Sequence, residues 1–348
     1  MAETELEIHN RMLTGISDEY DKSDGSFIYD ATKPPAIELA YLQEQIEIVE
    51  SKLDIMNLKD DELSRFVYAR TGITRKSATH ANSILKIVGN AGTKINQGDL
   101  ASTPSGVLYE FIESTTIDST GIINVKVICQ SPGAIGNTPA NTITILPISI
   151  DGVVSITNQS AVTNGYNAET DEELRERYFD KLQRPGKAGN KYHFEEWAKS
   201  VVGVGDARCI PRYNGPLSVK VIIIDSNGMP ASSELVATTR TLIESEMAFG
   251  VEDLAVVGAT AVPINLAVTL RLLSSAEMGT VVANIKANIK AYLKELAFKA
   301  NRVSYAKIGA LIIETEGVAD YENLLVNGAT ANVEILDDQV AIVGGVNE

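Results

Sequence analysis

The chain has 348 residues, which is long for one hydrophobic core and favours roughly two to four domains, and 44% of its residues are hydrophobic. Its formal net charge of −16 argues against a nucleic-acid-binding surface, because phosphate binding needs a concentrated cationic patch, whereas basic protein partners remain possible. The two cysteines, Cys129 and Cys209, form no CxxC pair, so neither a zinc knuckle nor a disulfide framework is indicated, and folding in a reducing cytoplasm fits.

The beginning of the chain, MAETELEIHN, is acidic and lacks the apolar core of a Sec signal peptide. The longest apolar runs, such as VKVIIID, have the length of a strand rather than that of a membrane span. We therefore expect no membrane insertion.

Residues 1–76 are predicted to be helical and carry 16 acidic and 9 basic side chains. Six apolar residues follow one another at spacings of 3, 4, 3, 4 and 3, which is the seam of a coiled coil: Leu39, Leu42, Ile46, Val49, Leu53 and Met56. A second apolar line widens this face: Ile37, Tyr41, Ile48 and Ile55. A shorter helix is expected over Asp61 to Arg70, with Gly72 as its C-terminal stop.

Two interpretations of the seam stay open, because it covers fewer than three heptads. The helix can be amphipathic and pack on its own domain, or it can join a bundle with helices of a partner protein. The second apolar line favours the partner bundle, since one intramolecular contact would not cover so wide a face.

Residues 77–165 differ abruptly from the first region, with 5 acidic and 3 basic side chains and 38 of 89 positions Ser, Thr, Asn or Gly. Alternating apolar residues predict strands at 106–114, 122–130 and 141–146, separated by glycine-rich turns. The stretch GNAGTK lacks the spacing of a phosphate-binding loop, so turns explain the glycines better. This region is predicted to be a β-rich domain.

Residues 166–259 are predicted to alternate helices and strands, beginning with a helix at Thr170. Thr170 and Glu173 form the pattern of a capping box, and Asp171–Arg175 and Glu173–Arg177 are opposite charges four residues apart. A helix start explains these charges better than a carboxylate metal site, which would need further converging ligands. The other expected elements are a helix through 193–201, strands near 206–213 and 217–225, a helix over 232–247 and a strand over 253–259.

Residues 260–348 are predicted to form a second mixed layer of helices and strands. The expected elements are a strand over 265–273, a helix carrying Val282, Ile285, Ile289, Leu293 and Leu296, a helix over 307–313, a strand over 322–326, a turn at Asn327-Gly328 and a hairpin over 333–343. The predicted fold class is α+β multidomain, divided as a helical region 1–76, a β-rich domain 77–165 and two α+β domains, 166–259 and 260–348.

Residue types that perform catalysis or bind metals are scarce. The three histidines, His9, His80 and His193, fall in different segments, and HFEEW lacks the second histidine that a helical zinc site needs. No nucleophile elbow, Walker A motif or dinucleotide fingerprint occurs, so we expect no catalytic residue, no cofactor and no metal. Trp197 is expected in the core, with an interface anchor as the alternative.

A basic group lies around the loop QRPGKAGNK: Lys181, Arg184, Lys187 and Lys191. It could meet an anion, but Glu195 and Glu196 follow closely, so a solvated loop or a protein-contact rim is the favoured interpretation.

Several motifs in order resemble the baseplate J-like family of contractile phage tails, particularly the version in defective prophage particles. They extend from end to end: DGSFIYDATKPPAIELAYL, GITRKSATHA, NAGTKINQGDLASTPSGVLYEF, GAIGNTPANTI, SITNQSAVTNGYNAETDEELRERY, KYHFEEWAKSVVGVGDARCIPRYNG and LLVNGATANVEILDDQVAIVGGV. Each motif alone is weak, and their order and spacing together are specific. Two departures are Asn164-Gly165, where a double glycine is common, and GPLSVKV, where a further glycine is expected.

The resemblance implies a structural wedge component of a baseplate, assembled with sixfold symmetry around the tail hub in the bacterial host cytoplasm. It implies that the N-terminal helices join a bundle with a second wedge protein and a sheath-initiating protein, and that later domains bridge neighbouring copies. It further implies a mechanical role, in which rearranged contacts between wedges release the sheath to contract. The competing class is a tail-associated carbohydrate-binding or hydrolytic module. Residues 77–165 argue against it, because they contain no tryptophan on which a sugar could stack and few carboxylates for hydrolysis.

Overall fold

The fold is that of a computed structural model, which describes residues 2–187, 189–247, 250–274 and 276–347. The chain is an α+β protein that separates into two compact units. The first unit comprises residues 1–75 and 170–178, and the second comprises residues 76–169 and 179–348. The four-domain division expected from the sequence stays a prediction.

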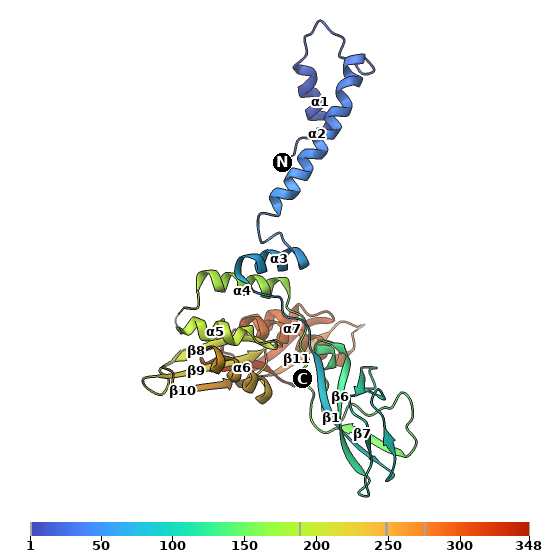
Figure 1. The fold of residues 1–348 in the computed structure, drawn as a ribbon, viewed down its shortest axis with the longest axis vertical. Coiled ribbons are helices and arrows are strands. Elements are labelled where there is room, and N and C mark those ends of the chain that lie inside the picture. Colours follow the sequence, from blue (N-terminus) through green and yellow to red (C-terminus); the bar gives the residue numbers. More distant parts are fainter. Residues whose placement is uncertain (1, 188, 248–249, 275, 348) are drawn as a thin grey trace. The chain divides into compact units, whose positions relative to one another are not determined.

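The first unit is helical. Its helices are α1 (Glu5–Thr14), α2 (Phe27–Ser51), α3 (Asp60–Thr71) and the beginning of α4 (Asp171–Gln183). Helices α1 and α2 lie side by side (Figure 1). Helix α3 ends at Thr71 and is followed by Gly72, whose φ of 72° is left-handed, so the stop predicted at this glycine is confirmed.

The start of α4 is held by the capping box that the sequence predicts. The Glu173 amide donates to the Thr170 hydroxyl at 3.2 Å, and the Thr170 amide donates to the Glu173 carboxylate at 3.0 Å. The expected partner of Asp171, Arg175, is engaged elsewhere: its guanidinium donates to the carbonyl oxygens of Ile55 and Leu58. Asp171 is paired instead with Arg75, at 2.5 Å. The charges at this helix start therefore join segments of the first unit, whereas the sequence predicted that Asp171 would pair within α4.

The second unit begins with an antiparallel five-stranded sheet in the order β3-β4-β6-β1-β7. Its strands are β1 (His80–Gly89), β3 (Leu100–Ser102), β4 (Leu108–Phe111), β6 (Ile122–Pro132) and β7 (Val153–Asn158), accompanied by the pair β2 (Lys94–Ile95) and β5 (Thr115–Thr116) and the short 3-10 helix η1 (Ala134–Gly136). The strands predicted within 106–114 and 122–130 are confirmed as β4 and β6.

The strand predicted over 141–146 is wrong. This segment makes only one isolated bridge, between Ile145 and Ser102, and Asn141 has a left-handed φ of 61°. The side-chain oxygen of Asn158 accepts from the amides of residues 142 and 143, both at 2.9 Å. The Asn158 side chain thus satisfies the two backbone amides that would otherwise have bonded to a neighbouring strand.

The central part of the second unit has helices α5 (Lys191–Ser200) and α6 (Ser233–Glu246) and a sheet in the order β10-β9-β8. Its strands are β8 (Val204–Pro211), β9 (Ser218–Asp225) and β10 (Asp253–Gly258), so the predicted alternation of helices and strands is confirmed. Both helices pack on this sheet (Figure 1). Val221 and Ile223 of β9 join the core under the helices, whereas Ile222 and Ile224 face a second core, which explains the continuous apolar run of this strand.

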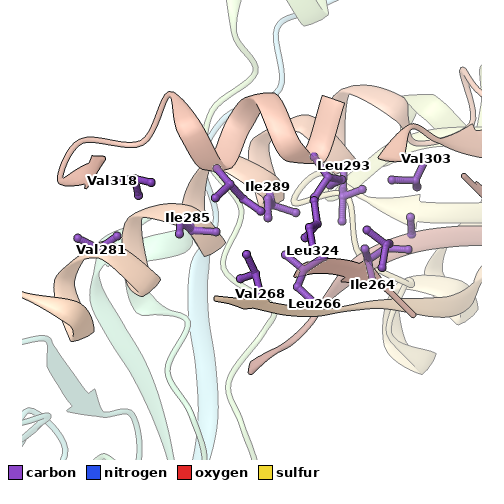
Figure 2. Packing of buried hydrophobic residues seen from close by; sticks show 14 of the residues in the cluster. Ile264, Leu266, Val268, Val281, Ile285, Ile289, Leu293, Val303, Val318 and Leu324 are labelled. Carbon is purple, nitrogen blue, oxygen red and sulfur yellow. The ribbon is translucent and has the colours of Figure 1, made fainter. Parts of the chain in front are cut away.

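The last part of the second unit has a sheet in the order β13-β11-β15 and two helices. Its elements are β11 (Thr260–Leu272), α7 (Met278–Leu296), β12 (Arg302–Val303), α8 (Tyr305–Ile313), β13 (Val318–Val326), β14 (Val333–Glu334) and β15 (Gln339–Asn347). Figure 2 shows the stripe of α7 facing Leu266 and Val268 of β11. The buried residue at the start of this stripe is Val281 rather than the predicted Val282.

The hairpin predicted over 333–343 is wrong. Strand β14 pairs with β12, and β15 pairs in parallel with β11, so the two halves of the expected hairpin go to different partners. The turn predicted at Asn327-Gly328 is confirmed, because both residues have positive φ, 49° and 78°, and Val326 and Ala329 exchange backbone hydrogen bonds across it. Within the described residues, no helix combines the length and the apolar character needed to cross a membrane.

Candidate functional site: an exposed apolar stripe on helix α2

Helix α2 starts at a capped serine and continues through two prolines. The Tyr29 amide donates to the Ser26 hydroxyl at 3.2 Å, which satisfies one of the free amides at the helix start. Pro34 and Pro35 lie inside the helix, where each lacks the amide that would bond to the preceding turn. The helix nevertheless extends over 25 residues, long enough to present several turns to another protein.

One side of α2 is covered by α1. Ala36 of α2 and Ile8 of α1 are buried, and His9 of α1 is buried with them. The His9 Nε2 donates toward the Thr32 hydroxyl at 2.9 Å and the Tyr29 carbonyl at 3.2 Å, and the imidazole meets the Tyr29 ring edge-on at 4.5 Å. His9 is therefore a structural residue that attaches α1 to α2.

The predicted partner-helix seam lies on the exposed side of this region. Four of its residues belong to α2, have side chains between 41% and 62% exposed, and are here called the apolar stripe: Leu39, Leu42, Ile46 and Val49. Leu53 and Met56 are more exposed still, at 77% and 60%. Large aliphatic side chains at this exposure leave about half of their apolar surface in contact with water, so much of their hydrophobic stabilisation is not gained within the chain.

The seam does not remain helical to its end, which corrects the predicted spacing. Helix α2 stops at Ser51, so Leu53 and Met56 lie in the turns that follow it. The Asn57 side chain donates to the Ser51 carbonyl at 2.9 Å, and the Asp54 carboxylate accepts from the Met56 amide at 2.9 Å. These side chains take the places of the next helical hydrogen bonds and so end the helix.

The second apolar line is divided between surface and core. Ile37, Tyr41 and Ile48 are between 43% and 55% exposed. Ile55 is buried, and its carbonyl accepts from Arg175 at 3.1 Å, so this residue belongs to the core of the first unit. The second line therefore ends before the chain turns toward α3.

The apolar residues of α2 occupy separate sectors of the helix. At about 100° per residue, the apolar stripe spans an arc of roughly 80°, and Ile37, Tyr41 and Ile48 share an arc of roughly 40° centred about 140° away. The buried Ala36 points into the remaining sector, which α1 covers. Two of the three apolar faces of α2 are thus open in the isolated chain.

The charge around these faces is negative. Helix α2 contains Lys33 as its single basic residue, and its acidic residues are Asp30, Glu38, Glu44, Glu47 and Glu50. A helix that packed against the apolar stripe would therefore meet acidic side chains at its edges, which favours basic residues on that partner.

The remaining residues singled out from the sequence are not brought together. His80 donates from Nδ1 to the Cys129 carbonyl at 2.8 Å, within the five-stranded sheet. His193 accepts from the Gly189 amide at 3.3 Å and stacks on Trp197, with ring centroids 3.9 Å apart. Trp197 is partly buried against the core of the central part. Across the described residues, no group of three or more His, Cys, Asp or Glu side chains is arranged to hold a metal ion.

The basic group near the loop after α4 is largely engaged with its own surroundings. Lys181 pairs with Glu196 at 2.6 Å, Arg184 lies 3.8 Å from Asp180, and the Lys191 ammonium is 4.8 Å from the Tyr192 ring. These contacts fit the solvated-loop interpretation; residue 188 of this loop lies outside the described residues.

Sequence reasoning missed the buried acid Asp225. Asp225, at the end of β9, accepts from the amides of Asn227 and Met229 at 2.9 and 2.8 Å. Burial raises the pKa of its carboxyl to about 6, against the opposing effect of these hydrogen bonds. Burial, with the charge of Asp225 adding to it, raises the pKa of Tyr166 to about 12. The sequence signal was DSNG, a turn motif, and the role of Asp225 here is to hold that turn.

Three segments of the chain match models of protein domains, and all three domains belong to one family. The Baseplate J-like protein barrel domain matches residues 84–165, the Baseplate J-like central domain matches residues 186–271, and the Baseplate J-like protein C-terminal domain matches residues 264–347. The phage-like element PBSX protein XkdT of Bacillus subtilis (strain 168) is 30% identical over 355 residues, which cover 97% of this chain and 95% of that protein. The baseplate protein gp47 of Escherichia phage Mu is 31% identical over 172 residues, 48% of each chain.

Among solved structures, one match is a chain in the cryo-EM structure of the anti-feeding prophage (AFP) baseplate, 6-fold symmetrised. The two chains are 11% identical, with a TM-score of 0.38, over 90% of this chain and 86% of the other. A similarity at this level is too low to transfer contacts or positions from one structure to the other.

Proposed function

This chain belongs to the baseplate J-like family of phage and prophage baseplate proteins, and we propose that it is a wedge component that binds partner proteins through the apolar stripe of α2. The observation that carries this proposal is the exposure of Leu39, Leu42, Ile46 and Val49 on a helix that already has α1 on another side. In this proposal the protein has a structural role: it holds other polypeptides in place and needs no catalysis, cofactor or nucleotide.

The partner is proposed to be helical because the stripe repeats at helical spacing. Residues at i, i+3, i+7 and i+10 present their side chains as a row that fits between the side chains of a facing helix. Full burial of an exposed aliphatic side chain contributes about 1.5–3 kcal/mol, and the stripe residues still have roughly half of that gain available, so the four together can contribute substantially to a contact. The family resemblance points to a second wedge protein and a sheath-initiating protein as the sources of these helices.

The second unit is proposed to connect neighbouring copies of the chain into a sixfold ring around the tail hub. A ring requires contacts between two different surfaces of each copy, which a chain with several folded parts can supply. The ring is proposed to pass on the trigger for sheath contraction when contacts between copies change from one arrangement to another. In this scheme the protein is assembled in the cytoplasm of the bacterial host and resides in the baseplate of a phage or phage-like particle.

The proposal is tested by placing a charge on the stripe. Leu39→Asp and Ile46→Asp are each expected to abolish co-purification with the partner wedge protein, because a carboxylate cannot be buried between apolar helices without a large loss of free energy. Gln45→Asp is the matched control, since it adds the same charge next to Ile46 but outside the stripe, and it should co-purify normally. The intrinsic fluorescence of Trp197 should show that the second unit stays folded in all three variants. Undiminished co-purification of both stripe variants would contradict the proposed role.

A further inference from the structure

The β-rich part of the second unit, residues 76–169, is not followed directly in the chain by the central part of that unit. Residues 170–178, which lie between the two parts in the sequence, belong to the first unit. Noncovalent contacts therefore hold the β-rich part on the central part, and the chain does not force these contacts to persist. A contact of this kind can open while both parts keep their own folds.

The two ends of the β-rich part are tied to each other by four hydrogen bonds. The Thr79 amide donates to the Tyr166 carbonyl at 2.9 Å, and the Tyr166 amide donates to the Thr79 hydroxyl at 3.0 Å. The Glu169 amide donates to the Lys76 carbonyl at 3.0 Å, and the Lys76 amide donates back to the Glu169 carboxylate at 3.0 Å. The two ends therefore act as one connector.

Tyr166 anchors this connector in the core of the central part. Its side chain is buried and belongs to the same hydrophobic core as Phe194 of α5. Gly203 leaves room for the ring, because its φ is 96° and a β-carbon at this position would lie 2.6 Å from the Tyr166 ring. The Lys76 ammonium adds a hydrogen bond to the Val204 carbonyl at 2.8 Å. The β-rich part is thus attached by an aromatic side chain that fits against a glycine.

The turn at residues 225–228 is bonded to both sides of this contact. The Ser226 amide donates to the Gly203 carbonyl at 2.8 Å, and the Asn227 side-chain amide donates to the Gly165 carbonyl at 3.4 Å. Asp225 sets the shape of the turn, because its carboxyl group accepts from the backbone amides of residues 227 and 229. A change at this carboxyl group therefore acts on the residues that hold Tyr166 in place.

The surroundings of Asp225 make its ionisation unfavourable. Burial raises the pKa of its carboxyl to about 6, against the opposing effect of the hydrogen bonds to the turn and of the positive charge of Lys290 in α7. Lys294 of α7 packs against the same turn. Burial and the charges of Asp225 and of Glu234 in α6 raise the pKa of Tyr166 to about 12, so this residue stays uncharged near neutral pH.

We infer that Tyr166, Gly203 and the turn 225–228 form a latch between the β-rich part and the central part, and that loss of the proton from Asp225 weakens this latch. An ionised carboxylate is more stable in water than in a buried site, so ionisation favours outward movement of the turn. That movement breaks the hydrogen bonds of Ser226 and Asn227 and uncovers the Tyr166 ring. The latch lies within the second unit and does not depend on the proposed binding by α2.

The direction of the pH effect follows from the two states of the latch. In the closed state Asp225 holds its proton more tightly than in the open state, where a solvated aspartate has its ordinary pKa of about 4. The closed state is therefore strongest below about pH 4, weakens as the pH rises to about 6, and changes little above that value.

Amide hydrogen exchange of the full-length chain tests the role of Asp225. The readout is the protection of the Ser226 amide relative to an unfolded peptide at the same pH, because outward movement of the turn releases this amide. Its protection should fall about tenfold between pH 5 and pH 7. In Asp225→Asn, whose side-chain oxygen can accept the same amides without titrating, the protection should be equal at both pH values. Asp151→Asn removes an exposed carboxylate and is the matched control, which should keep the tenfold fall.

The same measurement shows whether the opening is local. The Val221 amide lies in β9, the middle strand of its sheet, and exchanges only when that sheet opens. Ser226 should be at least about a hundredfold less protected than Val221, because the turn opens while β9 stays folded.

Gly203→Ala tests the geometry of the contact separately. The added β-carbon meets the Tyr166 ring, so oxidation of Tyr166 by hydroxyl radicals should rise several-fold at pH 5 and at pH 7 alike. Gly215→Ala is the matched control, since Gly215 has a similar φ of 92° and no described atom lies within 4 Å of the position of its β-carbon. It should leave the oxidation of Tyr166 unchanged.

Each result bears on one part of the latch. Ser226 protection that is equal at pH 5 and pH 7 in the wild-type protein, or a fall that persists in Asp225→Asn, would overturn the role of Asp225. Equal protection of Ser226 and Val221, or oxidation of Tyr166 that Gly203→Ala does not raise, would overturn the latch itself. None of these measurements involves a partner protein, so the stripe variants test the role of α2 independently.

Discussion

Helices α2 and α7 both repeat apolar side chains at helical spacing, and they differ in what covers those side chains. In α7 the stripe of Val281, Ile285, Ile289 and Leu293 is at most 2% exposed and packs on the sheet of its own unit. In α2 the corresponding stripe is at least 41% exposed. Spacing thus determines that a helix has an apolar face, whereas the rest of the fold determines whether the chain or a partner covers that face.

The difference predicts unequal costs for the same truncation. Ile285→Ala should lower the free energy of unfolding of the second unit by about 3 kcal/mol, because it leaves a cavity among buried side chains. Ile46→Ala should change the stability of the isolated chain by less than about 0.5 kcal/mol, since Ile46 is 56% exposed. Denaturant unfolding followed by Trp197 fluorescence measures the first change, and circular dichroism of the helices measures the second. Equal costs at both positions would show that α2 is covered within its own chain.

The second unit, which contains the buried stripe of α7, also contains the buried carboxyl group of Asp225. This group makes the stability of the second unit depend on pH. The pKa of Asp225 is raised to about 6 by burial, so its contribution is complete below the ordinary aspartate value and is lost as the pH rises through about 6. Relative to Asp225→Asn, the wild-type protein should therefore lose about 2 kcal/mol of stability between about pH 4.5 and pH 7.5. Chemical unfolding of both proteins at the two pH values measures this. A stability difference that is constant, or that changes in the opposite direction, would show that Asp225 is not buried as a titrating acid.

How much could be predicted from the sequence depended on how local the interactions were. The capping box of Thr170 and Glu173, the stop at Gly72 and the Asn327-Gly328 turn each involve residues close in the chain, and all three were predicted correctly. The hairpin expected over 333–343 failed because β15 pairs with β11, which lies far away in the sequence. Pairings of this kind leave no pattern within a short window.

The candidate site was predictable only in part, for the same reason. Heptad spacing identified Leu39, Leu42, Ile46 and Val49 as one face, which needs only the period of a helix. Helix α2 ends at Ser51 because the side chains of Asp54 and Asn57 bond to backbone groups that a continuing helix would use. The heptad pattern gave no sign of these side-chain hydrogen bonds. Exposure could not be read from the sequence either, because α7 has comparable spacing and is buried.

Within the first unit, the two sides of α2 should also respond differently. His9→Ala removes the imidazole that donates to Thr32, and the loss of this hydrogen bond should weaken the packing of α1 on α2 by about 1 kcal/mol. Amide hydrogen exchange of α1 should then become several-fold faster. Leu42→Ala on the apolar stripe is the control and should leave that exchange unchanged. Equal acceleration by both substitutions would show that the stripe, too, supports α1.

The central claim is that the apolar stripe of α2 is open in the isolated chain and covered in the assembled particle. Its most direct test is maleimide labelling of Ile46→Cys, for which the background is low because Cys129 and Cys209 are buried and burial raises the pKa of the Cys209 thiol to about 12. Ser119→Cys, at an exposed position of the five-stranded-sheet region, serves as the control for access. We predict that Ile46→Cys reacts rapidly in the isolated chain and at least about tenfold more slowly in purified particles, while Ser119→Cys reacts in both. Rapid labelling of Ile46→Cys in intact particles, or none in the isolated chain, would contradict the account.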